Sequence, residues 1–159
     1  MNPTEYARQI EAAFQGEVQG AAMFHDLSER LQDPEHRYKL RVLEQLEIET
    51  REVLRPLAER LIGTVNDGAT ARKTGIAQAS ALAAMPWAKF MHVFRREVAK
   101  FVAHFEELEK AGPADDSRVL AALTAHERAL QSFSECECSG ASANSLEPVV
   151  KLLRVVPTR

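Results

Sequence analysis

Apolar residues recur every three or four positions through four long segments of the chain, which is the spacing of one face of an α-helix. The clearest example is the stripe Leu40, Leu43, Leu54, Leu57 and Leu61. No segment sustains the alternation of apolar and polar residues that is typical of a half-buried strand. The pattern therefore predicts an all-α protein.

Helix-start and helix-stop residues divide this pattern into separate helices. Asn2 and Asp33 each precede a proline, as expected for an N-cap residue followed by proline at the first helical position. Gly63 and Gly140 follow the periodic segments, where a glycine often ends a helix. These signals predict long helices at 3–31, 34–62, 86–110 and 114–138.

The connections between these helices predict how they are arranged. Short links join the first helix to the second and the third to the fourth, so each pair is expected to form an antiparallel hairpin. Residues 63–85 are long enough to cross from one end of a bundle to the other, and the Ala-rich stretch 69–84 is expected to be a short helix. A short amphipathic helix is expected at 146–155. We therefore predict one domain, 1–159, folded as an antiparallel four-helix bundle with a long crossover.

A glutamate interrupts each apolar stripe near the middle of its helix. Thirty residues separate Glu17 from Glu47, and thirty separate Glu97 from Glu127. A shift of 80 residues therefore superimposes the glutamates of the first hairpin on those of the second. We expect the four side chains to point inward at similar depth. Buried carboxylates repel one another unless they are paired or bound to a cation, and hard oxygen ligands suit iron(II), manganese and magnesium.

This layout resembles the ferritin-like superfamily, which includes rubrerythrins and other di-iron carboxylate proteins. In that family two helices each contribute one glutamate, and the other two each contribute a Glu-x-x-His motif. The resemblance covers residues 3–138 and implies that Glu17, Glu47, Glu97 and Glu127 are metal ligands, with iron or manganese as the metal. It also implies ancestry among di-iron oxidoreductases or iron-handling proteins. Thr50 and Leu130 stand where the family has its two histidines.

Two functional hypotheses follow from these residues. In the first, the carboxylates hold a dinuclear or mononuclear metal site, and His104 or His126 compensates for the missing histidines. In the second, the site has lost its metal, the ammonium of Lys100 replaces the cation, and the bundle serves as an interaction or scaffold protein. No catalytic residue is assigned, and whether the chain is an enzyme stays open.

Composition and charge narrow the classes of partner. Of the 159 residues, 20 are basic and 23 acidic, and the resulting net charge of −3 argues against a general nucleic-acid binder. No apolar run is long enough for a membrane span, and the first residues do not resemble a signal peptide, so a cytoplasmic protein is expected. Cys136 and Cys138 are expected to be reduced thiols. Aromatic residues cover more than one stripe of 86–110, which predicts a homodimer through that helix.

Overall fold

The computed structural model describes residues 1–66 and 68–159, and the elements in these residues are all helical. This confirms the all-α prediction. None of the described helices combines the length and the low charge that a bilayer span requires. The helices are α1 (Pro3–Arg30), α2 (Pro34–Ile62), α3 (Ala69–Ala83), α4 (Trp87–Ala111), α5 (Ser117–Ser139) and α6 (Glu147–Val150), with 3₁₀ turns η1 (Ala114–Asp116) and η2 (Ser142–Asn144).

The long helices begin and end close to the predicted positions. The side chain of Asn2 accepts a hydrogen bond of 2.8 Å from the amide of Glu5, and Asp33 caps α2 in the same way. Gly63 and Gly140 follow α2 and α5 with φ of 77° and 84°, values that favour glycine. The helix predicted from residue 114 starts instead at Ser117, because 114–116 form the 3₁₀ turn η1.

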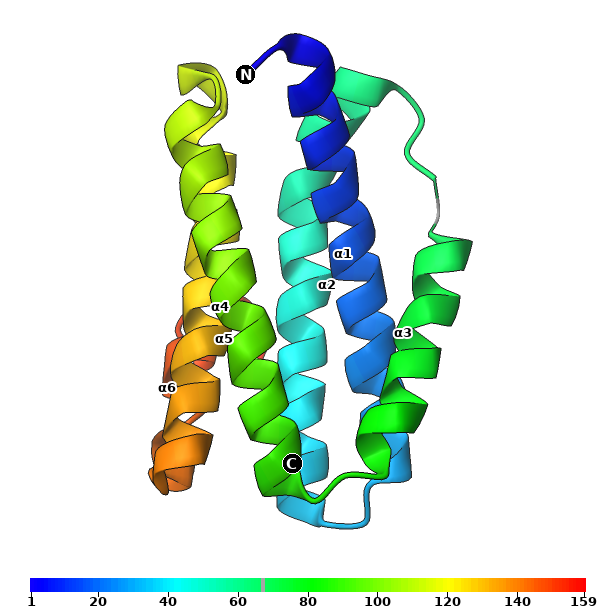
Figure 1. Ribbon diagram of the computed structural model, residues 1–159, viewed down its shortest axis with the longest axis vertical. Helices are drawn as coiled ribbons and strands as arrows, with labels where there is room; N and C mark the ends of the chain where they lie inside the picture. The colour runs from blue at the N-terminus through cyan, green and yellow to red at the C-terminus, as the bar shows by residue number, and fades with distance from the viewer. Residues whose placement is uncertain (67) are drawn as a thin grey trace.

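The long helices lie side by side in two pairs, as Figure 1 shows. Helix α1 packs against α2, α4 packs against α5, and α5 joins the pairs by packing against α2. Helix α3 lies along the outer side of α1 and carries the chain between the two pairs. Two apolar clusters fill the interior, one around Phe24, Leu43 and Phe90 and the other around Ile10, Leu54 and Phe105.

The C-terminal segment differs from the prediction. A helix was expected at 146–155, but α6 ends at Val150. Beyond it, the backbone amides of Arg154 and Val155 donate hydrogen bonds of 2.8 and 3.0 Å to the Glu49 carboxylate on α2. The predicted helix is wrong in this part because Glu49 binds the backbone of the segment alongside α2.

Helix α3 approaches α1 closely at a glycine. A Cβ atom placed on Gly75 would lie 2.3 Å from the backbone oxygen of Gln19 and 3.1 Å from the backbone nitrogen of Met23. These are backbone atoms of α1, which cannot move aside as a flexible side chain can. Gly75 therefore allows α3 to pack directly on α1.

We expect the substitution Gly75→Ala to destabilise the protein. The new methyl group would collide with the α1 backbone, and overpacking of this kind costs about 1–3 kcal/mol. The measurement is the free energy of unfolding in urea, followed by circular dichroism.

Gly16→Ala is the matched control for this prediction. Gly16 also lies within a helix, but a Cβ atom there would meet nothing within 4 Å. The control should therefore gain up to about 1 kcal/mol from the higher helix propensity of alanine. Equal effects of the two substitutions would contradict the close packing of α3 on α1.

Candidate metal site

A layer of polar side chains separates the two apolar clusters in the middle of the molecule. Glu17 comes from α1, Glu47 and Thr50 from α2, and His126 and Glu127 from α5. All five residues are buried, and none of them is more than 7% exposed. Three acidic groups and one basic group are therefore enclosed together with little exposed surface.

The imidazole of His126 stands at the centre of this layer. Its Nε2 atom lies 3.3 Å from Oε1 of Glu47, and its Nδ1 atom lies 3.6 Å from Oε2 of Glu17. Nδ1 also shares a hydrogen bond of 2.7 Å with the hydroxyl of Thr50. The ring is thus held in one orientation by residues of α1 and α2, although it belongs to α5.

One carboxylate oxygen in this layer lacks a hydrogen-bond partner. Among the described residues, Oε2 of Glu17 is the only buried side-chain oxygen or nitrogen without one. Leaving a buried polar atom unpaired costs free energy. An unpaired atom of this kind therefore indicates a position where a further partner could bind. Glu47 is accommodated differently: a Cβ atom on Gly20 would lie 2.4 Å from its Oε2, so the glycine leaves room for the carboxylate.

Burial and mutual repulsion alter the protonation of these groups. Burial raises the pKa of Glu17 well above its usual value, and the nearby carboxylates of Glu47 and Glu127 raise it further. Burial also raises the pKa of Glu127 to about 7, partly offset by the positive charge of His126. For His126, burial alone lowers the pKa, but Glu17 and Glu47 overcome this effect and raise the pKa to about 10. Without a metal, the layer therefore holds a protonated imidazole, and Glu17 and Glu127 keep their protons to a higher pH than exposed glutamates do.

The same donors fit a divalent cation. Glu17, Glu47 and His126 each offer one ligand atom, and these three atoms lie within 4.8 Å of one another. Carboxylate and imidazole donors together suit iron, manganese and zinc. A cation placed here would give the unpaired oxygen of Glu17 a partner. The residues present therefore fit a metal ion.

The predicted glutamates are brought together in part. Glu17, Glu47 and Glu127 point inward as expected, but the expectation for Glu97 is wrong. Glu97 is exposed, and its carboxylate pairs with the ammonium of Lys100 at 2.8 Å on the surface of α4. That ion pair also removes Lys100 from the interior, where the second hypothesis placed it.

The orientation of α4 explains this difference. The stripe predicted for this helix was Phe90, Phe94, Glu97, Phe101, His104 and Leu108. Phe90, Phe94 and Leu108 are buried as expected, but Glu97, Phe101 and His104 are exposed. In the stripe that faces the interior, the next residue along the helix takes the place of each exposed one, and the stripe is entirely apolar: Phe90, Met91, Phe94, Val98, Val102, Phe105 and Leu108. Rotating α4 in this way avoids burial of a fourth carboxylate, which would cost several kcal/mol.

His126 and Thr50 are the members of the site that the glutamate spacing alone did not predict. The signal for His126 is its position three residues after Leu123 and four before Leu130, which is the same apolar stripe that carries Glu127. Thr50 stands three residues after Glu47, where the ferritin-like pattern has a histidine. Its hydroxyl reaches the imidazole that α5 supplies.

Comparisons with known proteins do not place the chain in a family. No protein-family model, no curated protein and no solved structure matches it. The assignment of a function therefore depends on the geometry of the polar layer.

The pKa values lead to a prediction for the stability of the metal-free protein. The pKa of Glu127 is 4.5 in the unfolded reference and about 7 in the folded protein. A raised folded pKa stabilises the protein below pH 4.5, and this contribution, about 3 kcal/mol at most, is lost as the pH rises through 7. The contribution of His126 has the same sign: it is present below pH 6.5 and lost as the pH rises through about 10.

Glu127→Gln tests the Glu127 contribution, because glutamine mimics the protonated acid. In the presence of a chelator, the variant should equal the wild type in stability near pH 4.5 and exceed it above pH 7. Urea unfolding at pH 4.5, 6 and 8 measures the difference. A constant difference across this range would contradict a raised pKa for Glu127.

Proposed function

We propose that this chain is a ferritin-like four-helix-bundle protein that binds a transition-metal ion, iron or manganese, in the middle of the bundle. Glu17, Glu47 and His126 would be the principal ligands, and Glu127 would complete the acidic set. The observation that carries the proposal is the buried cluster of these side chains, in which one carboxylate oxygen is unpaired. Ancestry among di-iron oxidoreductases or iron-handling proteins is the expectation that goes with it.

Each residue of the cluster has a separate task in this proposal. Glu17 and Glu47 would supply oxygen ligands and negative charge. His126 would supply a nitrogen ligand through Nε2. Its Nδ1 would then carry the ring hydrogen and donate to Thr50, a hydrogen bond of the kind that orients metal-binding histidines. Because the imidazole is protonated without the metal, binding would release a proton. A bound iron ion would supply electron transfer to or from dioxygen or peroxide.

The ligand set differs from the ferritin-like pattern in two ways that bear on the number of ions. The histidine comes from α5 rather than from the position of Thr50 on α2. Helix α4 contributes no ligand, because Glu97 is on the surface. Three carboxylates and one imidazole support a single ion better than a pair of ions, so we propose a mononuclear site.

A second candidate function is a metal-free interaction or scaffold protein. The observation that favours it is the His126 imidazole between Glu17 and Glu47, since a protonated ring supplies a positive charge to the carboxylates. In this case the imidazolium of His126, rather than a metal ion, supplies the positive charge that balances the buried carboxylates.

Metal content and metal affinity distinguish the two candidates. We expect protein purified without chelators to contain one iron or manganese ion per chain by elemental analysis. After the metal is removed, titration with Mn²⁺ should show one site by electron paramagnetic resonance. Glu17→Gln and Glu47→Gln should each weaken this site by at least about tenfold, because each removes a charged ligand.

Glu97→Gln is the matched control, since it makes the same chemical change on the surface of α4. It should leave the Mn²⁺ affinity unchanged. Sub-stoichiometric metal in the purified protein, together with Mn²⁺ binding that Glu17→Gln leaves unchanged, would reject the metal site and favour the metal-free protein.

A further inference from the structure

A groove separates α1 from α4 beside the polar layer. These two helices scarcely approach one another along their backbones, unlike the pairs α1–α2 and α4–α5. Their side chains do meet: Phe24 of α1 packs edge-on against Phe94 of α4 at 5.7 Å, and Ile10 of α1 belongs to the same apolar cluster as Phe105 of α4. Between these contacts lies a groove of about 690 Å³.

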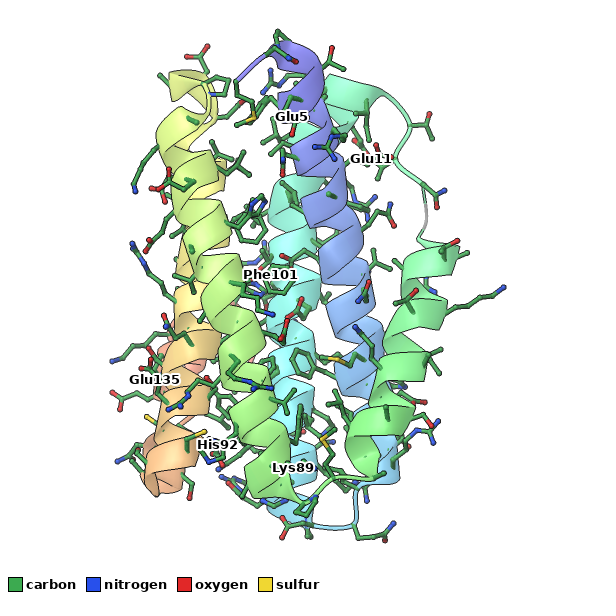
Figure 2. The ribbon with its side chains drawn as sticks, in the orientation of Figure 1. Glu5, Glu11, Lys89, His92, Phe101 and Glu135 are labelled. Carbon is green, nitrogen blue, oxygen red and sulfur yellow. The ribbon has the colours of Figure 1, made fainter. Side chains whose placement is uncertain are left out.

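Small residues on the α1 wall leave part of the groove open. Ala12 and Gly16 lie on this wall beside larger residues such as Gln19 and Met23, and a Cβ atom on Gly16 would meet nothing within 4 Å. The α4 wall carries large apolar residues, among them Phe101. Figure 2 shows Phe101 in the space between α4 and α1, and this aromatic side chain is 51% exposed. Small residues on one wall therefore leave space that aromatic residues border on the other.

The groove leads to the candidate metal site. Glu17, Glu47 and Glu127 all line it, although each side chain has little exposed surface. Its volume is within the range of about 300–1,000 Å³ that is usual for small-molecule sites. A molecule lying along the groove would therefore contact the carboxylates as well as apolar side chains of both clusters.

The charges around the groove restrict the kind of molecule that it can hold. None of the described residues that line it is a lysine or an arginine. Its polar lining consists of glutamates, glutamines and His104. In the metal-free protein, an anionic head group would lose its hydration here and meet acidic side chains without a lysine or arginine to pair with.

We propose that this groove binds an elongated, uncharged apolar small molecule, such as a long-chain alcohol, with its polar group against Glu17, Glu47 and Glu127. Its use as a substrate at the metal rests on the proposed function. Binding in the groove does not rest on the proposed function, because the residues that line the groove are in place without a metal ion.

Fluorescence of a neutral apolar probe tests the groove in protein kept free of metal by a chelator. We expect N-phenyl-1-naphthylamine to bind with one site per chain and to be displaced by 1-decanol. Decanoate, which has the same chain length but a negative charge, should displace the probe at concentrations at least about tenfold higher.

Gly16→Leu is the informative variant, because leucine would fill the groove from the α1 side. It should weaken probe binding at least tenfold without lowering the melting temperature, since leucine favours the helix more than glycine does. Ala99→Leu adds the same side chain at an exposed position of α4 outside the groove and should change nothing. Phe101→Ala removes an exposed wall residue and should also weaken binding.

Several results would overturn the proposal. They are absence of probe binding, equal displacement by decanoate and decanol, and binding that Gly16→Leu leaves unchanged. Sedimentation showing a dimer that Gly16→Leu dissociates would assign the groove to a second copy of the chain instead. Because the probe is measured without metal, failure of the groove and failure of the Mn²⁺ site are separate results.

Discussion

The imidazole of His126 makes it possible for three glutamates to share the interior of this protein. A carboxylate enclosed among apolar side chains without a partner is very costly, and three enclosed together would also repel one another. The ring contacts two of them, Glu17 and Glu47, and its charge acts on Glu127 as well. The polar layer therefore depends on one basic group whose charge is smaller than the acidic charge around it. Burial is the main reason for the raised pKa values of Glu17 and Glu127, and the neighbouring carboxylates, which one imidazole cannot fully neutralise, add to it and attract a cation.

The polar layer also organises the core. The apolar cluster around Phe24, Leu43 and Phe90 lies on one side of it, and the cluster around Ile10, Leu54 and Phe105 lies on the other. Helices α1, α2 and α5 each contribute apolar residues to both clusters and at least one carboxylate between them. The register of these three helices is thus restricted, because sliding one of them by a turn would place a glutamate within an apolar cluster.

Much of the helical framework could be predicted from the sequence, because its determinants are local. The caps at Asn2 and Asp33 and the glycine at 63 act within a few residues, and the helices they delimit are present.

The side of α4 that faces inward could not be predicted in this way, because it depends on the neighbouring helices. Two stripes on that helix have similar spacing, and matching Glu97 to the other glutamates selected the wrong one. The helix predicted at 146–155 ends early, at Val150, for a related reason: the carboxylate of Glu49 on α2 binds the backbone amides of Arg154 and Val155. His126 could be placed on a buried stripe from spacing alone, but its contact with Thr50 depends on how α5 meets α2.

The packing of α3 on α1 has a mechanical consequence for the rest of the molecule. Helix α1 is pressed between α2 on one flank and α3 on another, and the backbone contact at Gly75 leaves it little freedom to shift. The α4–α5 hairpin meets the other pair mainly through α5 and α2. The first pair of helices and α3 therefore form the more tightly braced part of the molecule, and the polar layer is least enclosed on the side where α4 faces α1.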